Sequence, residues 1–237
     1  MHTVLAVCAR ENRLQSVLHR HHIVPPTGGK LYHPDQRNWW LGLELAAGDK
    51  LRVRQELVML DQLDTLIDET SDELYRLSLS DPWREQLPYL IQLPGIGALT
   101  AMVILSAVGD IKRFPSAKKL VGYAGLGARI HASGLTFHTG GITKQGRREL
   151  RAALVETAWV TVRVDPGWRE QFERLEQRIG RRKAIVAIAR KLLVVVWHVL
   201  FHRRVDRQSD PERVVRYLLA WGRQARVFTR SGLKASE

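Results

Sequence analysis

The sequence predicts a mainly α protein with a long-helix or coiled-coil segment first and a compact helical domain after it. Three observations support this class. Apolar residues repeat every seven positions between 53 and 77, apolar runs at helical spacing recur from residue 98 onward, and a single stretch rich in Gly, Thr and Ser lies at 124–143. We expect a helical coiled-coil segment over 1–82, a compact domain over 83–205, and a basic, partly disordered tail over 206–237.

The first segment is expected to contain two helices and a loop. Apolar spacing predicts a helix over 3–20, and a cluster of Pro and Gly residues predicts a loop over 23–38. A long helix is expected from about 39 to 79. Its heptad positions are Val53, Leu60, Ile67 and Leu74, with Leu63, Thr70 and Leu77 between them. This seam predicts a coiled coil or a long helical hairpin, and through it a homo-oligomer.

Six acidic residues surround this seam and admit two interpretations. A cluster of carboxylates could hold a metal ion, whereas a charged helix face could simply be solvated, and we favour the solvated face. The residues are Asp61, Asp64, Asp68, Glu69, Asp72 and Glu73.

The second part begins with turn and cap signals. Leu93-Pro94-Gly95-Ile96-Gly97 predicts a tight turn before a helix over 98–108, and Ser116 is expected to cap a helix that runs through Tyr123. Residues 124–143 are expected to form a loop or a short β-hairpin.

Three further helices are expected, over about 146–163, 166–179 and 181–202. Asp165-Pro166 provides a cap and a first-turn proline for the middle one. The last contains the most apolar run of the chain, with Arg190 and Lys191 in its middle. Two charges there favour a buried helix of a soluble protein over a membrane span.

The formal net charge of +13 lies entirely in the second half of the chain. Residues 1–110 hold 10 Lys and Arg against 14 Asp and Glu, and residues 111–237 hold 27 against 10. A positive field confined to one region predicts a polyanionic partner, and solubility alone would need far less charge. Cys8 is the only cysteine, which excludes a disulfide framework and fits a reducing cytosol. With no signal peptide apparent, we expect a cytoplasmic, nucleoid-associated location and no membrane partner.

Two motifs suggest contacts to nucleic acid. Gly95 and Gly97 stand where a helix-hairpin-helix turn lets its backbone approach a phosphate, although a turn that merely packs two helices would use the same letters. The second motif places Thr143, Lys144, Arg147, Arg148 and Arg151 at the start of a helix, as an anion cradle on one helix face; a solvated basic face is the alternative. Lys118 and Lys119 are expected to add to this nucleic-acid-binding set.

Ser133 is a candidate nucleophile that needs support from elsewhere. A serine before glycine in a loop usually carries no chemistry, and a hydroxyl nucleophile requires a base or a metal. The nearest candidate bases in sequence are His131 and His138.

Taken in order, these motifs resemble the C-terminal domain of the insertion-sequence 110/116/902-type transposases. The matching stretches are LPGIGALTAMVILSAVGDIKRFPSAKKLVGYAGL from residue 93, SGLTFHTGGITKQGRRELRAALVETA from residue 133 and the later RKLLVVVWHVL, while RENRLQSVLHR at 10–20 looks like the start of the family's coiled-coil region. The resemblance implies a DNA recombinase in which Ser133 attacks the DNA backbone and becomes covalently joined to it. It also implies a structured guide RNA as partner, and an N-terminal RuvC-type domain whose four acidic residues bind Mg²⁺.

One departure from the family pattern bears on catalysis. Met1 lies almost at the start of the coiled-coil region, and the helix acids at 61–73 do not match the four RuvC-type carboxylates. We therefore expect no cofactor in this chain, with Mg²⁺ held in an acidic domain beyond it, and we expect the chain alone to bind nucleic acid without cutting it. The alternative is a non-catalytic binding module or the relic of a decayed transposase.

Overall fold

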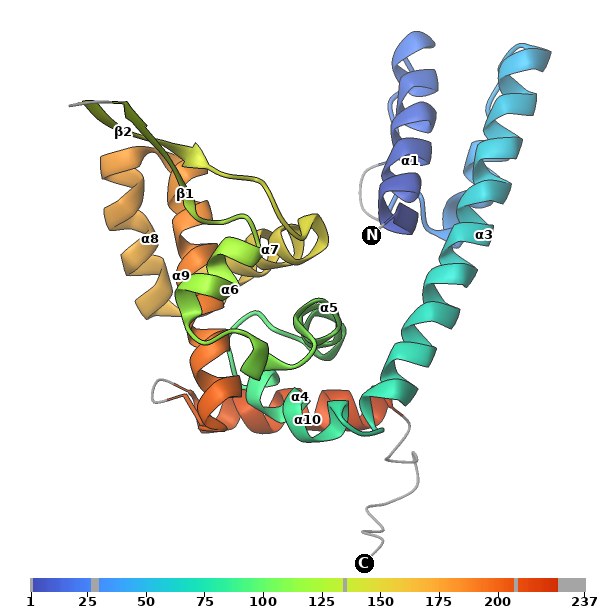
Figure 1. Cartoon of the computed structure of the whole chain (residues 1–237). Helices are drawn as coiled ribbons and strands as arrows, with labels where there is room; N and C mark the ends of the chain where they lie inside the picture. The colour runs from blue at the N-terminus through green and yellow to red at the C-terminus, as the bar shows by residue number, and fades with distance from the viewer. Residues whose placement is uncertain (1, 27–29, 134–135, 207–208, 226–237) are drawn as a thin grey trace, which may run out of the picture. The chain divides into compact units, whose positions relative to one another are not determined.

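The computed structural model describes the backbone of residues 2–26, 30–133, 136–206 and 209–225, and the side chains of these residues except those of 2–5, 130–133 and 136–140 (Figure 1). The predicted mainly α class is confirmed, since helices form most of the described chain. Contacts divide the chain into two compact units, which we call unit 1, Met1–Asp72, and unit 2, Glu73–Glu237. Each unit is described by itself.

Unit 1 is built on helix α1, His2–Arg20, and on α3, Ala47–Ser78, which continues past the boundary of the unit. A short 3₁₀ turn, Pro34–Gln36, and helix α2, Arg37–Leu41, lie between them in sequence. Apolar residues of all three helices form one buried cluster: Leu14, Val17, Leu18, Trp40, Val53, Leu57 and Leu60. This cluster gives unit 1 a small core of its own.

The long helix does not start at 39 as predicted. Helix α2 ends at Leu41, Gly42 caps it, and α3 begins only at Ala47. Trp40 explains the break, because its ring is buried and its indole N–H donates to the Leu31 carbonyl at 2.9 Å, which ties this segment to the preceding loop. The apolar heptad that predicted the long helix begins only at Val53, so it could not predict the conformation of residues 39–46.

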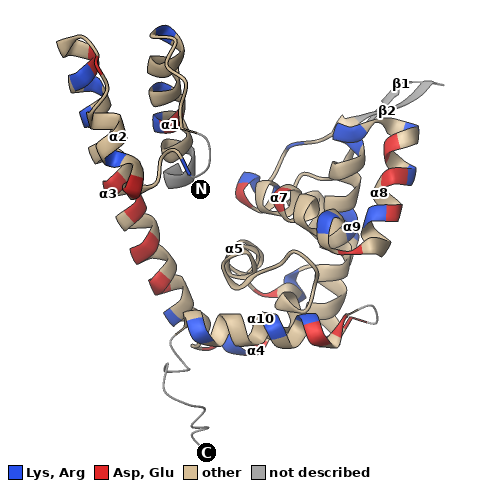
Figure 2. Ribbon diagram, turned by 180° about the vertical axis from the view of Figure 1, so that it is seen from behind, with Lys and Arg blue, Asp and Glu red and all other residues tan. Residues whose placement is uncertain are grey.

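The heptad seam of α3 is divided along its length. Val53 and Leu60 are buried in the unit 1 core, and Leu74 and Leu77 pack against the core of unit 2. Between them Leu63 and Ile67 are only half-buried, and Leu66 is 52% exposed. The six acids around this stretch are exposed, as expected for a solvated face (Figure 2). The coiled coil itself stays a prediction.

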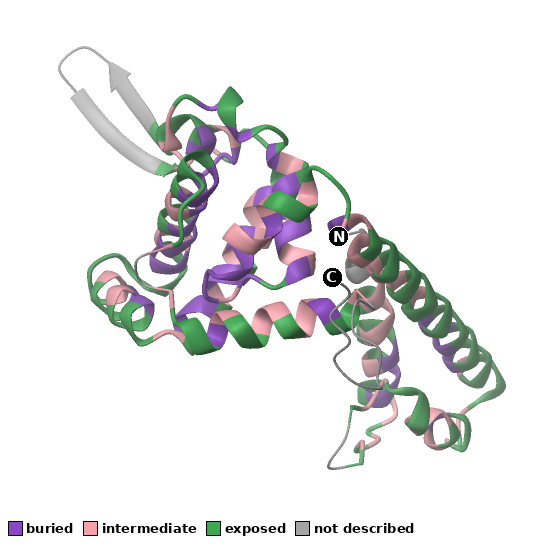
Figure 3. Cartoon of the chain, turned by 90° about the horizontal axis from the view of Figure 1, so that it is seen from below, coloured by how far each residue is buried: buried purple, intermediate pink, exposed green. Residues whose placement is uncertain are grey.

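Unit 2 is a helical domain with one two-stranded hairpin. Its described elements, in order, are α4 Trp83–Ile91, α5 Ala98–Val108, the 3₁₀ turn η2 Ile111–Arg113, α6 Ala117–Tyr123, β1 Ala128–Ser133, β2 Thr136–Ile142, α7 Arg148–Val164, α8 Pro166–Ile179, α9 Arg181–His202 and α10 Pro211–Gln224. Helix α9 contacts α4, α6, α7 and α8 and is the centre of the domain (Figure 1). Buried and exposed residues alternate along the helices (Figure 3).

Helix α9 is long and apolar enough to cross a membrane, the one such helix in the part of the chain that the structure describes. More than half of that stretch is buried inside unit 2, including Ile188, Leu192 and Val196, which are fully buried. The predicted buried helix is therefore confirmed as the core helix of this domain.

Several local predictions in unit 2 have clear outcomes. Asp165 caps α8 by accepting from the Trp168 N–H at 3.1 Å, as expected. Ser116 stands at the N-cap of α6, but its side chain makes no capping bond. The tail contains helix α10, whose Leu218 and Trp221 pack against the core. The last ten residues, 228–237, which were expected to be disordered, lie outside the described residues.

Candidate nucleic-acid interface

The hairpin of unit 2 rests on a tightly bonded base, which we call the hairpin root: residues 123–127 and 143–147. Three backbone bonds join its two sides, from the N–H groups of Thr143, Lys144 and Arg147 to the carbonyls of Gly127, Gly125 and Tyr123, at 2.9, 3.1 and 3.0 Å. Gly146 has φ +137°, and a side-chain carbon there would collide with the Tyr123 carbonyl oxygen. Only glycine allows the two sides to approach this closely.

The predicted anion cradle is partly rearranged by this root. Lys144 lies in the loop with φ +57° and Arg147 is the N-cap residue, so α7 begins at Arg148 and not at 146. The expected single helix face for residues 144, 147, 148 and 151 is therefore wrong, because Gly146 turns the chain against Tyr123 before the helix starts. Arg148 is exposed, whereas Arg151 is half-buried and donates to the Ala124 carbonyl at 3.1 Å.

The segment from Ile111 to Arg151 is strongly basic, and most of its cations are exposed. It holds nine Lys and Arg residues and one acid, Glu149. No described carboxylate lies within ion-pair distance of any of the nine, and all are exposed except Arg151. We call this set the basic face: Lys112, Arg113, Lys118, Lys119, Arg129, Lys144, Arg147, Arg148 and Arg151. Unpaired cations at this density attract polyanions.

Sequence reasoning missed Tyr123 and Arg113 as parts of this region. The Arg147 Nε–H donates to the Tyr123 hydroxyl oxygen at 3.0 Å, and the Arg113 guanidinium lies 4.8 Å from the centre of the Tyr123 ring. The hydrogen bond from Arg147 lowers the pKa of Tyr123, and Arg113 lowers it further. The pairing spans 24 residues of sequence, so no local motif announces it.

Gly95 and Gly97 stand in different surroundings. Gly95 has φ +80°, and a side-chain carbon there would lie 2.7 Å from the Thr161 hydroxyl, which in turn donates to the Pro94 carbonyl. Close packing of the turn against α7 is thus sufficient to explain why residue 95 is a glycine. Gly97 is exposed and precedes α5, next to a pocket that Trp221 and Gln224 of α10 also line. A phosphate contact at these glycines stays a prediction.

Ser133 is the last residue of β1 and pairs in register with Thr136. The same register places His131 opposite His138. The side chains of these residues, and Gly134 and Leu135 altogether, lie outside what the structure describes, so the predicted nucleophile is located by backbone alone.

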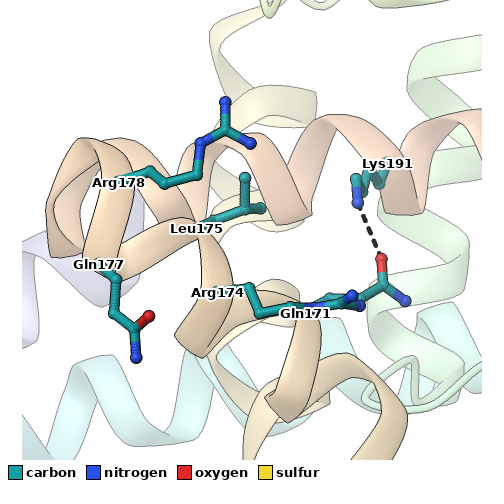
Figure 4. A pocket seen from close by; sticks show the side chains of 6 residues that line it. All are labelled: Gln171, Arg174, Leu175, Gln177, Arg178 and Lys191. Carbon is teal, nitrogen blue, oxygen red and sulfur yellow. Dashed lines mark hydrogen bonds between the residues drawn. The ribbon is translucent and has the colours of Figure 1, made fainter.

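A second basic area lies between α8 and α9 (Figure 4). Arg174, Arg178 and Lys191 line a hollow of about 440 Å³ together with Gln171, Leu175 and Gln177. The Lys191 ammonium donates to the Gln171 side-chain oxygen at 2.8 Å. No motif in the sequence indicates this hollow, because its cations come from two different helices.

The acids of α3 do not form a metal site. Arg37 pairs with Asp61, and Arg76 donates to Glu73 at 2.8 Å. Within the described ranges, no group of three or more His, Cys, Asp or Glu residues could hold a metal ion. The described residues of this chain therefore do not fit the Mg²⁺ that the resemblance implies.

The basic face of unit 2 is rich in exposed Lys and Arg residues without ion pairs, and this is the composition of a surface that binds polyanions. Residues 87–173 match the model of the Transposase IS116/IS110/IS902 family. The resemblance to this family stated from the sequence is thus confirmed for that part of unit 2.

Related proteins extend this finding. The pilin gene-inverting protein of Moraxella bovis is 40% identical over 118 residues, which are 48% of this chain and 37% of the relative. The Moraxella lacunata protein of the same name is 37% identical over 146 residues, 60% of this chain and 42% of the relative. The transposase for insertion sequence element IS1111A of Coxiella burnetii is 32% identical over 119 residues, 48% and 33% of the two chains. The chain spans less than half the length of these relatives.

Proposed function

We propose that this chain is the part of a transposase that binds DNA and presents Ser133 for attack on the DNA backbone. The observation that carries the proposal is a coincidence of position: the family match over 87–173 contains the whole basic face, Lys112 to Arg151. The relatives support the general activity by their printed names, as transposases and gene-inverting proteins. Duplex DNA is the polyanion that such an activity requires.

The proposed step is a transesterification. The Ser133 oxygen forms a bond to phosphorus while a P–O bond of the DNA backbone breaks, and the serine proton ends on the departing strand's oxygen. No oxidant or reductant is needed. His131 and His138, which pair in the hairpin register, are the candidates nearest in sequence to carry the proton between these oxygens. We assign Mg²⁺ to no residue of this chain and propose that acids supplied from beyond it hold the ion.

Covalent capture of DNA tests this role of Ser133. The chain is mixed with labelled duplex DNA, first alone and then with Mg²⁺ and a polypeptide that carries the acidic domain, and protein–DNA adducts are separated under denaturing conditions. We expect binding without adduct for the chain alone, an adduct after supplementation, and loss of the adduct in Ser133→Ala. Ser106→Ala, a change at an exposed serine of α5, is the matched control and should leave the adduct in place.

Two results decide between the proposal and its rival. An equally strong adduct with Ser133→Ala overturns the nucleophile. Salt-sensitive DNA binding with no adduct under any supplementation favours a non-catalytic binding module instead.

We further propose that α3 joins two copies of the chain through the uncovered part of its seam, at Leu63 and Ile67, together with the neighbouring exposed Leu66. The double variant Leu66→Glu/Ile67→Glu should reduce the sedimenting mass to that of one chain, whereas Asp64→Ala on the acidic face should not. An unchanged mass for the apolar variant removes the coiled-coil dimer. A guide RNA is proposed on the resemblance alone, and RNA binding is included in the experiments below.

A further inference from the structure

Arg113, Tyr123 and Arg147 form a compact cluster at the hairpin root. The Tyr123 hydroxyl donates to the Ala107 carbonyl at 3.1 Å and accepts from Arg147 at 3.0 Å, so both of its hydrogen-bonding roles are used. Arg113 lies over two rings at once, 4.7 Å from the centre of Phe114 and 4.8 Å from that of Tyr123. The aromatic pair therefore holds two guanidinium groups close to one phenol.

The two arginines of this cluster are open to an external anion. Both are exposed, and neither forms an ion pair with a described carboxylate. Each guanidinium has five N–H donors, of which the contacts to Tyr123 use few. Two cations held together without an acid between them repel each other, and a bound anion removes that cost. Planar guanidinium groups match the geometry of phosphate oxygens in particular.

Hydrogen bonds and helix ends fix the backbone that carries the cluster. Tyr123 ends α6, Arg147 opens α7, and the backbone bonds of the hairpin root join the two. Arg113 belongs to the turn η2, whose neighbour Phe114 accepts a 2.9 Å hydrogen bond from the buried Trp197 indole. A binding site built on such fixed elements loses little side-chain entropy when its ligand arrives.

We propose that Arg113 and Arg147, positioned by Tyr123, bind one phosphate of the DNA backbone at the hairpin root. The inference rests on the proposed function, since it takes duplex DNA as the ligand of the basic face. Ser133 lies five residues beyond Ala128 along β1, or roughly 17 Å at the usual strand rise. The cluster therefore holds a phosphate away from the reacting one, and its residues position DNA without touching the atoms that react.

The salt dependence of DNA binding by the full chain tests this site. Fluorescence anisotropy with a labelled 20-base-pair duplex gives the affinity between about 50 and 200 mM salt. The double variant Arg113→Ala/Arg147→Ala should lower the log–log salt slope by about 0.9, the contribution of one neutralised phosphate. The matched control Arg84→Ala/Arg216→Ala removes two exposed cations of unit 2 that form no described ion pair, and it should keep the wild-type slope.

A conservative variant separates binding from a structural role. Tyr123→Phe keeps the ring beneath Arg113 but removes the hydroxyl that fixes Arg147, so binding should weaken by about three- to tenfold. The same change removes the hydroxyl's bond to the Ala107 carbonyl, so a loss of about 1 kcal/mol in the free energy of unfolding is expected as well. If Arg147→Ala does not fold, Arg147→Lys replaces it, because lysine keeps the charge and loses the guanidinium fork. A Tyr123→Phe chain that loses stability but keeps the wild-type DNA affinity shows that the hydroxyl is a structural lock alone, which overturns the positioning by Tyr123.

The remaining outcomes distinguish the two levels of the proposal. A wild-type slope in the double variant overturns the phosphate site while DNA binding stands. Absence of any salt-sensitive binding by the wild-type chain overturns the proposed function and this site together. The same measurement is repeated with an RNA duplex of the same sequence. If the double variant loses the same salt slope on DNA and on RNA, the site binds the phosphodiester that both share. If it loses slope on RNA alone, the assignment to DNA is overturned.

Discussion

The two units of this chain use their basic residues in opposite ways. In unit 1, Glu56 accepts from Arg10 and Arg13, both at 3.1 Å, and Asp49 accepts from Arg20 and His21. In unit 2, the nine cations of the basic face have no described acid within ion-pair distance. These ion pairs of unit 1 join α1 to α3, whereas the cations of the basic face remain available, although elsewhere in unit 2 Arg213 pairs with Asp165 at 3.2 Å. Net charge alone does not reveal a binding surface; the pairing of the charges does.

The tyrosines show the same contrast. Burial and the nearby Glu11 raise the pKa of Tyr32 in unit 1, whereas Arg147 and Arg113 lower the pKa of Tyr123 in unit 2. A phenol with a raised pKa lies in apolar or negative surroundings, and one with a lowered pKa lies in a positive field. The lowered pKa of Tyr123 thus reflects the cations around it, whereas the raised pKa of Tyr32 reflects mainly its burial.

The largest effect is expected at the hairpin root. Gly146→Ala should destabilise unit 2 by about 3 kcal/mol, because the new side-chain carbon meets the Tyr123 carbonyl and φ is +137°. Thermal unfolding measures the change. Gly122→Ala in α6 is the control: a side chain there meets nothing within 4 Å, so this change should be neutral or stabilising by about 0.5–1 kcal/mol. Equal stability of the two variants would show that the root is not closely packed.

A smaller loss is expected when an internal ion pair of unit 1 is broken. Glu56→Gln should lower the free energy of unfolding by about 2 kcal/mol, because the mostly buried carboxylate leaves two arginines without their charge partner. DNA binding should not change, which separates unit 1 from unit 2. Glu69→Gln, on the exposed face of α3, should stay within about 0.5 kcal/mol. A loss of DNA affinity in Glu56→Gln would contradict the division of roles between the units.

The smallest effect is spectroscopic. On alkaline titration followed by phenolate absorbance, Tyr123 should ionise below its ordinary pKa of 10.0 and Tyr32 above it. Arg147→Ala should move the Tyr123 transition upward, because the guanidinium no longer stabilises the phenolate. Because the pKa of Tyr123 is lowered in the folded chain, its ionisation contributes to stability. This contribution is fully present above the unfolded pKa of 10.0 and is lost as pH falls through the lowered pKa. Identical transitions for both tyrosines would remove the contrast between the units.

Local signals in the sequence predicted much of the fold. Asp165-Pro166 predicted the start of α8, because a cap depends on neighbouring residues only. The run containing Arg190 and Lys191 predicted a buried helix, because two charges are compatible with a helix whose polar side faces water. Gly42 and Trp40 were not recognised as the end of a short helix, since what fixes them is a hydrogen bond to Leu31 in the preceding loop.

The candidate site was predictable in composition but not in geometry. Lys118, Lys119 and Arg148 could be named from charge and spacing, and they are exposed as a binding role requires. Lys144 was placed on a helix because the sequence does not show that Gly146 folds back onto Tyr123. Tyr123 itself acquires its significance from Arg147 and Arg113, which meet it only after the hairpin root has closed.

The central claim is that DNA binds the unpaired basic face of unit 2 and not unit 1. The most direct test compares two triple variants of the full chain, Lys118→Ala/Lys119→Ala/Arg148→Ala in unit 2 and Lys50→Ala/Arg52→Ala/Arg54→Ala in unit 1, which remove equal charge from exposed positions. Affinity for a short DNA duplex is measured as a function of salt. We predict that the unit 2 variant lowers the log–log slope by up to about 2.7 and that the unit 1 variant leaves it unchanged. Equal losses in the two variants, or a loss in unit 1 alone, would contradict the claim.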